Sequence, residues 1–541
     1  MTARRKPMSA TKMIKAISKT RLLLAAMAAM ALLLPATARA AAPGITGPVF
    51  NLTAQAAYIS QPDGAMIYSW GYGCSSVPSG FAPAAISGAT CSTMQVPGPT
   101  LIVTEGQTVT VNLINNLPNP AGNTSILFPG FQVTATLGVQ GLLTREATRA
   151  AGTTAVRYTF VASSPGTHAY YSGTQSDLQV EMGLYGAIIV LPNSVPTACT
   201  SPAIRTNLFG VASFTGTREH DYRLAAAAYD HVKSCYDREY LFQFSEIDPV
   251  IHSQAQVQVA AKGIACTVTA PTCSLKVATE PYHPAYFLIN GRSMPDDMDP
   301  NYAFEYPHQP YNGNPHMHPG EQVLLRVIGQ GRWQHPFHEH GNHVRILGRD
   351  GNLILSQNDP ANNLAGPLLF TTTTTPGLAF DGIFYWTAKG MNWDAYGHNH
   401  ASAPACSPDA NGYNTVGVGA QSAINYYEWC QDHTKPMQAA PFGDVAGGGP
   451  VTLPDPNIFA NGAWFGGSPY LGPDATVRAT GPTGTTPPSG TIANSPTGEA
   501  GFAFMWHSHN EREITTNNIF PGGMLMMMLV DSREFVIDES N

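Results

Sequence analysis

Short apolar or alternating runs, each bounded by Gly, Pro or Asn, recur along the chain, and they recur twice in the same order. The first set lies at residues 97–118, 156–162, 165–173 and 183–192. The second set lies at residues 240–248, 285–292, 319–331, 380–390, 501–510 and 521–530. Runs of this kind are typical of β-strands separated by turns. A duplicated unit of about 150 residues predicts two Greek-key β-sandwiches.

We expect the first sandwich to span residues 45–193 and the second residues 199–541. Two segments interrupt the strand pattern of the second sandwich: residues 249–280, which hold two cysteines, and residues 400–500, which are rich in Gly, Pro, Ser and Thr. We interpret residues 400–500 as a long loop insertion at the surface, and a role as a lid over a site stays open for it. The predicted fold class is all-β.

Composition supports a turn-rich β protein. Charged residues make up 12% of the 541 residues, and the chain contains 52 Gly and 44 Pro. These values exclude a coiled coil, a helical solenoid and a highly charged disordered protein. The net charge of −8 argues against a nucleic-acid partner, since binding to phosphates needs an excess of basic residues.

The first 40 residues have the features of an export signal. Residues 1–21 contain seven basic and no acidic side chains, and the apolar run LLLAAMAAMALLLP follows, then small residues at Ala38 and Ala40. The run is shorter than the ~20 residues that cross a bilayer, and no later stretch is long and apolar enough to span one. Cleavage would leave 20 basic and 36 acidic side chains, a formal net charge of −16. We therefore predict a periplasmic or secreted protein.

The eight cysteines fit an exported, oxidised protein. Eight cysteines allow 105 pairings, so the sequence leaves the connectivity open. Pairs close in sequence, such as Cys74–Cys91 and Cys266–Cys273, are the simplest choice. Because no Cys-x-x-Cys motif occurs, thiol redox chemistry and a thiolate zinc site are both disfavoured.

Histidines gather in two strand-like segments, HPFHEHGNH and WHSHNERE. Side chains alternate between the faces of a strand, so His338 and His340 share one face, as do His507 and His509. If the two strands are neighbours, four imidazoles converge. One His-x-His is common without a metal, but two such pairs favour a metal site. Imidazoles without thiolates suit copper or zinc.

Two further pairs, His316 with His318 and His398 with His400, lie in loop-like sequence near Gly, Asn and Pro. We expect these four side chains to be exposed, with a peripheral metal-capture or second-shell role as the alternative.

Three segments resemble the multicopper oxidase family. PGPTLIVTEGQTVTVNLINNLP is similar to the first cupredoxin domain of these enzymes, and HPFHEHG to their His-Pro-x-His-x-His copper motif. GFAFMWHSHNEREITTNNIFPGGMLMMMLV resembles their C-terminal His-Cys-His segment and the strand after it. The resemblance covers most of residues 45–193 and 240–530. It implies two cupredoxin-like domains, copper as the cofactor and an oxidoreductase activity.

The chain departs from the family pattern at several copper ligands. The first two histidine pairs of the family are replaced by LFPGFQV and by Tyr171-Ser172-Gly173. Ser508 stands where the family has the cysteine of its blue copper site, and Glu513 where it has a histidine. A serine hydroxyl does not form the soft thiolate bond of a blue site. The resemblance therefore implies one metal, or at most a pair, on His338, His340, His507 and His509, and of the blue-site ligands only His335 remains.

A second cluster follows from strand alternation. His335 tends toward the face opposite His338, together with Glu339, and Ser508 and Glu513 face the same side. His335, Glu339 and Glu513 would make a harder nitrogen and oxygen site, suited to manganese, iron or zinc. The alternative, which we favour, is a hydrogen-bonded polar cluster without a metal.

These observations predict an exported copper-binding oxidoreductase that lacks the blue-copper cysteine and the first-domain histidine pairs. The alternative is a non-catalytic periplasmic protein that binds or buffers copper, or a scaffold with a relict site. The expected substrate is a small molecule or a metal ion. Two-domain relatives often form trimers with interface copper, so the resemblance leaves a homotrimer possible, although the missing first-domain histidines weaken it.

Overall fold

The computed structural model describes residues 42–86, 88–149, 155–200, 220–263, 273–387 and 501–531, with Cys266, Lys389, Ala410, Ile537 and the backbone of 467–470. The predicted signal, His398, His400, Cys406, Cys430 and most of residues 400–500 lie outside this part of the chain. The described residues include no helix long and apolar enough to cross a membrane.

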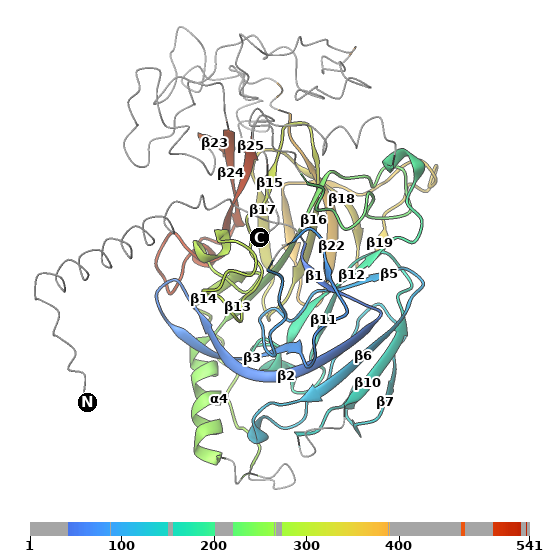
Figure 1. The fold of residues 1–541 in the computed structure, drawn as a ribbon. Coiled ribbons are helices and arrows are strands. Elements are labelled where there is room, and N and C mark those ends of the chain that lie inside the picture. The colour runs from blue at the N-terminus through green and yellow to red at the C-terminus, as the bar shows by residue number, and fades with distance from the viewer. Residues whose placement is uncertain are drawn as a thin grey trace, which may run out of the picture. The chain divides into compact units, whose positions relative to one another are not determined.

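Strands β1 to β12 form two five-stranded sheets, whose orders are β11-β12-β5-β1-β4 and β3-β2-β6-β10-β7 (Figure 1). The first sheet consists of β1 (Gly44–Thr46), β4 (Phe81–Ala82), β5 (Leu101–Thr104), β11 (Gly166–Tyr171) and β12 (Tyr185–Leu191). The second consists of β2 (Val49–Ser60), β3 (Met66–Cys74), β6 (Thr108–Asn115), β7 (Thr134–Thr136) and β10 (Val156–Val161). Strands β8 (Val139–Gln140) and β9 (Arg145–Glu146) form a separate ribbon.

Strands β13 to β25 form a second pair of sheets. One contains β13 (Arg238–Ile247), β14 (Tyr286–Ile289), β16 (Gln322–Gly329), β18 (Val344–Arg349), β19 (Asn352–Leu353), β20 (Leu368–Leu369) and β22 (Ala379–Tyr385). The other contains β15 (His316–Met317), β17 (His335–Glu339), β21 (Thr371–Thr374), β23 (Gly467–Tyr470), β24 (Gly501–Ser508) and β25 (Leu525–Asp531). The all-β, cupredoxin-like fold class is thereby confirmed.

Period-two burial explains why these segments form sandwiches. In β6, TVTVNLIN, every second side chain is buried, and Val109, Val111 and Leu113 enter the core of the first pair of sheets. Strand β16 holds the matching place in the second pair: it is buried on both faces, and every second side chain, Val323, Leu325 and Val327, enters the core of that pair. Both strands also have a parallel neighbour, β2 for β6 and β13 for β16. The two halves thus share one pattern of pairing, as the duplicated sequence predicts.

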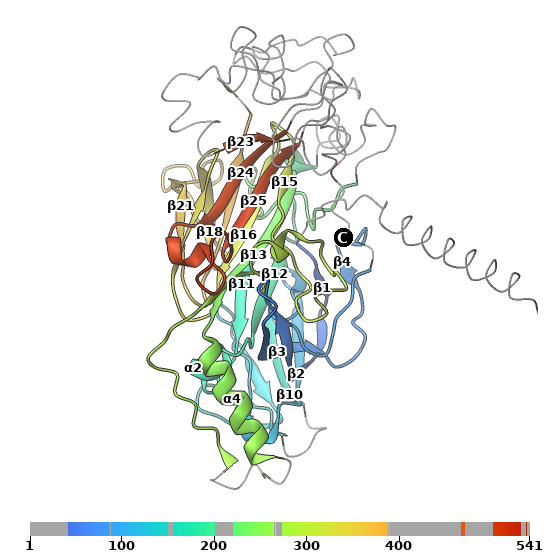
Figure 2. The ribbon, with the colours of Figure 1, turned by 90° about the vertical axis from the view of Figure 1, so that its left-hand side faces the viewer.

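The interruption at residues 249–280 contains a helix, α4 (Pro249–Lys262), that packs on the first pair of sheets (Figure 2). Asp248 caps it by accepting a hydrogen bond from the Val250 N–H at 2.9 Å. Ile251 and Ala255 are buried in the core of the first pair. The part of the chain that the structure describes also contains the helix α2 (Ser176–Gln179) and four 3-10 helices, Asn119–Ala121, Thr197–Cys199, Asp296–Met298 and η7 (Glu511–Ile514).

Within the described ranges, three disulfides join six cysteines. The predicted pairs Cys74–Cys91 and Cys266–Cys273 are confirmed. A third disulfide, Cys199–Cys235, joins the end of the first pair of sheets to the segment that leads into β13. The described residues contain no free cysteine.

We expect none of these six cysteines to react with an alkylating agent in the native, unreduced protein, because each sulfur is already bonded to another. Peptide mass spectrometry after alkylation, with and without prior reduction, measures this. Labelling of any of the six before reduction would contradict the pairing.

Candidate metal centre

Two neighbouring strands of one sheet carry the predicted histidines. Strands β17 and β24 pair antiparallel, with His338 directly opposite His507. Directly opposite residues of antiparallel strands point to the same face of the sheet, so both rings lie on one side. The two strands are therefore neighbours, as the predicted convergence of the histidines requires.

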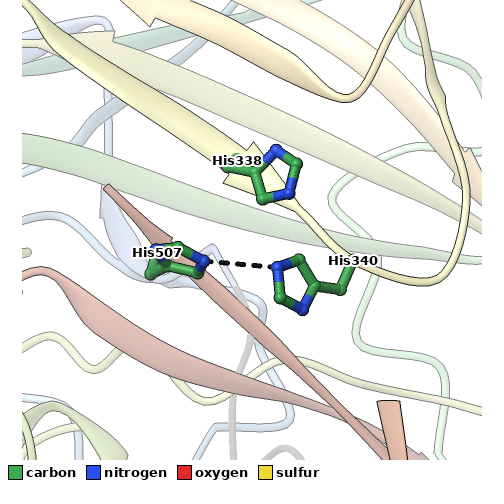
Figure 3. A group of neighbouring side chains, drawn as sticks. All are labelled: His338, His340 and His507. Carbon is green, nitrogen blue, oxygen red and sulfur yellow. Dashed lines mark hydrogen bonds between the residues drawn. The ribbon is translucent and has the colours of Figure 1, made fainter. Parts of the chain in front are cut away.

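Three imidazoles converge at this point. One nitrogen from each of His338, His340 and His507 lies within 4.8 Å of the others, and the rings face one another (Figure 3). The Nε2 atoms of His340 and His507 are 3.2 Å apart. Nitrogens bound to one ion at ~2.0–2.1 Å in tetrahedral geometry lie about 3.3 Å apart, so this spacing fits two ligands of a single metal.

The turn after β17 places His340. The indole N–H of Trp506 donates to the His340 carbonyl at 3.0 Å, from a side chain buried in the core. Gly341 has a φ of 96°, and a Cβ there would lie 2.9 Å from the Phe504 ring. Only glycine fits both the left-handed backbone and the close approach. The hydrogen bond from Trp506 and the backbone of Gly341 thus fix the turn that contains His340.

The local environment keeps His338 and His507 neutral. Burial, together with the charges of the neighbouring His340, His507 and His509, lowers the pKa of His338 to about 4. Burial also lowers the pKa of His507. The His507 Nδ1 atom lies 2.7 Å from the Ser508 carbonyl oxygen, which can only accept a hydrogen bond. The proton is therefore on Nδ1, and the lone pair on Nε2 faces His340.

Metal-binding histidines commonly have this arrangement, with one ring nitrogen fixed by a hydrogen bond and the other free to bind. His338 has a comparable contact, since its Nδ1 lies 2.6 Å from Thr371 Oγ1 on the neighbouring strand β21. Neutral imidazoles in this number fit copper, and zinc as well. The donor set therefore suits the metal that the family resemblance implies.

His509 lies at the rim of the site. Its side chain is exposed, and its ring centroid is 4.9 Å from that of His338 and 5.6 Å from that of His507. Its nitrogens are outside the group that meets the spacing for one ion. The structure thus brings three of the four predicted ligands together and places the fourth beside them.

The second cluster lies among buried side chains. His335 is completely buried, and both of its ring nitrogens contact carboxylates: Nδ1 is 2.9 Å from Glu513 Oε2, and Nε2 is 2.9 Å from Glu246 Oε2. Ser508 Oγ also donates to Glu513 Oε2. Burial by itself lowers the pKa of His335, but the hydrogen bonds and charges of Glu246 and Glu513 raise it to about 9. The ring is therefore an imidazolium near neutral pH.

An imidazolium bonded at both nitrogens has no lone pair for a metal. Glu246 and Glu513 lie on opposite sides of the ring, and neither pairs with Glu339. Glu339 is buried without a hydrogen bond to its carboxyl oxygens, and burial raises its pKa well above the usual range. Among the described residues, only His338, His340 and His507 form a group of three with the spacing for one ion. The geometry at His335 is that of a buried ion pair, which matches the metal-free alternative left open by the sequence.

Residues 87–195 match the sequence model of the multicopper oxidases. This part of the chain is similar to the multicopper oxidases. No curated protein matches it in sequence.

Solved structures similar to the chain include three copper proteins. A multicopper oxidase, mgLAC, has a TM-score of 0.42 and 14% identity, over 89% of this chain and 85% of that chain. A blue copper oxidase from Nitrosomonas europaea has a TM-score of 0.40 and 14% identity, over the same shares. A copper nitrite reductase from Nitrosomonas europaea has a TM-score of 0.36 and 18% identity, over 63% of this chain and 85% of that chain.

The segments that would carry the missing multicopper oxidase histidines lie side by side in the first sandwich. The Leu127 N–H donates to the Tyr171 carbonyl at 2.8 Å, within the two stretches that the sequence comparison singled out. Phe128, next in the chain, is part of the core. His168 does not replace the missing ligands, since its ring packs on Phe131 and its Nε2 lies 3.3 Å from the Ser164 carbonyl. The two segments thus lie together, but neither carries a histidine at these positions.

Two aspects of the region around the site were not predicted from the sequence. Glu246 was not identified as the partner of His335, although an acid in the apolar run YLFQFSEID was a signal for a buried pair. The predicted exposure of His316 and His318 is wrong, because both are buried. Strand β15, which contains His316, pairs in parallel with β25 at the edge of its sheet.

Proposed function

We propose that this chain is an exported copper-binding oxidoreductase in which His338, His340 and His507 hold one copper ion. The observation that supports this is the set of three imidazole nitrogens within 4.8 Å of one another. A copper ion bound there would supply one-electron redox chemistry. Export is supported by the three disulfides, which form in oxidising compartments.

The protein's own residues would orient the ligands and admit the substrate. The Ser508 carbonyl and Thr371 hydroxyl fix the rings of His507 and His338, and Trp506 fixes the backbone of His340. Exposed His509 lies on the open side of the site, where a fourth ligand or a small-molecule or metal-ion substrate would enter. The proposal leaves the oligomeric state open, with a homotrimer as one arrangement that it allows.

The buried ion pair at His335 limits where in the protein a substrate could give up an electron. Ser508, Glu513 and His335 stand where the family has blue-copper ligands, and they are bonded to one another and to Glu246. Because no thiolate is present, a substrate would have to give its electron directly at the three-histidine site.

We expect the copper-loaded protein to lack the intense blue charge-transfer band, because that band needs a thiolate bound to copper. A visible spectrum recorded at a known copper stoichiometry measures this. The same preparation should consume oxygen when given a phenol or a reduced metal ion. An intense blue band would overturn the role assigned to Ser508.

A second candidate is a non-catalytic copper-binding or copper-buffering protein. The observation that favours it is the double loss of the thiolate at Ser508 and of the histidine pairs in the first sandwich, near Leu127 and Tyr171. Stoichiometric copper binding without oxygen consumption, for phenols and for reduced metal ions alike, would select this candidate over the oxidoreductase.

A further inference from the structure

A cavity of about 520 Å³ opens beside β18, on the second pair of sheets. Basic side chains, Lys233, His343 and Arg345, contribute to its lining, and none of its lining residues is acidic. This is notable in a chain with 36 acidic and 28 basic residues. A concave site with converging cationic groups and no acid attracts an anion.

The two permanent cations of the cavity keep hydrogen-bond donors for a ligand. Lys233 Nζ donates to Asn363 Oδ1 at 2.8 Å, and Arg345 Nη1 donates to the Gly366 carbonyl at 2.6 Å. An ammonium has three N–H donors and a guanidinium five, so each contact holds the side chain without using up its donors. Among the residues that the structure describes, no carboxylate pairs with either side chain.

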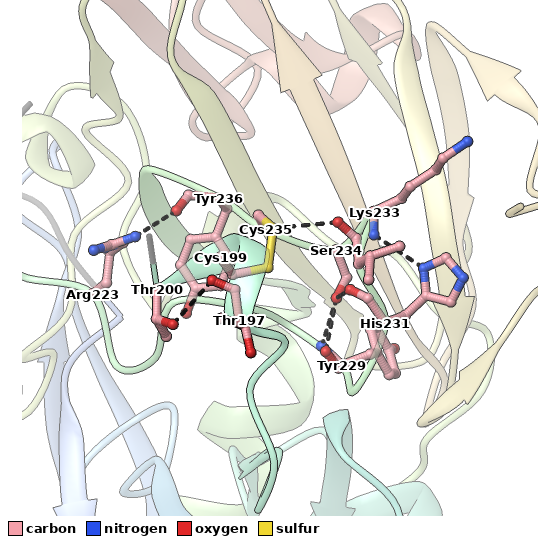
Figure 4. The surroundings of a disulfide bond; sticks show 11 residues. Thr197, Cys199, Thr200, Arg223, Tyr229, His231, Lys233, Ser234, Cys235 and Tyr236 are labelled. Carbon is pink, nitrogen blue, oxygen red and sulfur yellow. Dashed lines mark hydrogen bonds between the residues drawn. A yellow bond between two sulfur atoms is a disulfide. The ribbon is translucent and has the colours of Figure 1, made fainter. Parts of the chain in front are cut away.

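The segment that carries Lys233 is rigidly held (Figure 4). The disulfide Cys199–Cys235 lies two residues away, and Ser234 Oγ contacts the carbonyls of Tyr229 and His231 at 2.8 Å. The Lys233 side chain extends away from the disulfide in this view. A fixed backbone lowers the entropy that is lost when a ligand orders the side chain.

One part of the cavity wall is apolar, and its Ile383 is paired with Arg345 across strands β22 and β18. Leu347 is buried, and Leu364 and Ile383 pack against the hydrophobic cluster to which it belongs. A ring or short hydrocarbon placed on this wall would leave water while a carboxylate on its other end met Arg345 and Lys233. The combination therefore suits an amphipathic anion better than an inorganic one.

We propose that this cavity binds a small aromatic or aliphatic carboxylate. Phe370 lies between it and the metal centre: its ring centroid is 4.9 Å from that of His343, at the cavity, and 5.6 Å from that of His338. The proposal does not depend on a bound metal, because Lys233, Arg345 and the apolar wall are all outside the three-histidine group.

Calorimetric titration of the full-length protein with benzoate tests this, with benzamide as the neutral probe of the same shape. We expect benzoate to bind at least tenfold more tightly than benzamide. Arg345→Gln and Lys233→Gln should each weaken benzoate binding about tenfold and leave benzamide unchanged. The matched control is Arg349→Gln, an exposed arginine of the same strand that lies over the Phe380 ring, and it should bind benzoate like wild type.

A carboxylate could also bind directly to copper, so the titration is repeated on metal-free His507→Ala protein. Unchanged benzoate affinity there supports the cavity. Loss of binding in that variant, equal affinity for benzoate and benzamide, or benzoate affinity that is unchanged in both Arg345→Gln and Lys233→Gln would each overturn the proposal.

Discussion

Replacing His507 with alanine is expected to lower copper affinity by about a hundredfold or more. Loss of a hydrogen-bond partner behind a metal ligand typically costs 10–100-fold, and here a ligand itself is removed. Its Nε2 lies 3.2 Å from that of His340, so the variant leaves a pair of imidazoles where three converged. Equilibrium dialysis with elemental analysis measures the change.

His338→Ala should have a similar effect, and the double variant with His507→Ala should lose little more. Ligands of one ion act as a unit, so removing a second one from a broken site adds little. Full metal occupancy in the double variant would show that the ion binds elsewhere.

Two single variants serve as references for this series. His283→Ala removes an exposed histidine outside the metal centre and should bind copper like wild type. His509→Ala tests the rim position. If His509→Ala lowers copper affinity as much as His507→Ala does, His509 is a full ligand. If it lowers copper affinity only slightly, the protein supplies three ligands.

Raising the pH from 6 to 10 is expected to lower the free energy of unfolding through His335. Its pKa is about 9 in the folded protein, above the 6.5 of an unperturbed histidine. A group whose pKa is raised on folding stabilises the native state fully below its unfolded value, and this contribution is lost as the pH rises through the folded value. A pKa shift of this size corresponds to about 3 kcal/mol of unfolding free energy. Urea unfolding at a series of pH values measures it.

The matched variant is His335→Gln, which has no titrating ring. Its unfolding free energy should be lower than that of wild type at pH 6, and the difference should shrink as the pH approaches 9. Burial also raises the pKa of Glu181, to about 8, so this carboxyl destabilises the native state increasingly between its unfolded pKa and pH 8. That contribution is common to both proteins and cancels in the difference. A difference that is constant with pH would contradict the imidazolium assignment.

The parts of the fold that depend on local pattern were predictable from the sequence. Alternation is evident in TVTVNLIN, the sequence of β6, and the same period predicts that His338 in β17 and His340 in the turn after it share a face. The pairing of β17 with β24 could only be assumed, since it joins segments more than 160 residues apart. Once that pairing is present, the predicted convergence follows.

The parts that depend on contacts between distant segments were not predictable. His316 is buried because β15 pairs with β25, and nothing in the local sequence NPHMHPG indicates that partner. Glu246 pairs with His335 because β13 lies where it can reach β17 across the core. Local sequence indicates that an acid in a buried strand needs a partner, but not which one.

Ser508 has two attachments, and together they make its position unfavourable for a cysteine that binds copper. Its carbonyl oxygen accepts from the ring of His507, and its hydroxyl donates to Glu513. A lone Ser508→Cys substitution would place a thiol against that carboxylate, where repulsion between like charges disfavours the thiolate that copper binds, and beside a histidine that is already bonded at both nitrogens. At least Glu513, and with it the balance of charge around Glu246, would have to change as well. Building a blue copper site into this chain would therefore take several substitutions made together.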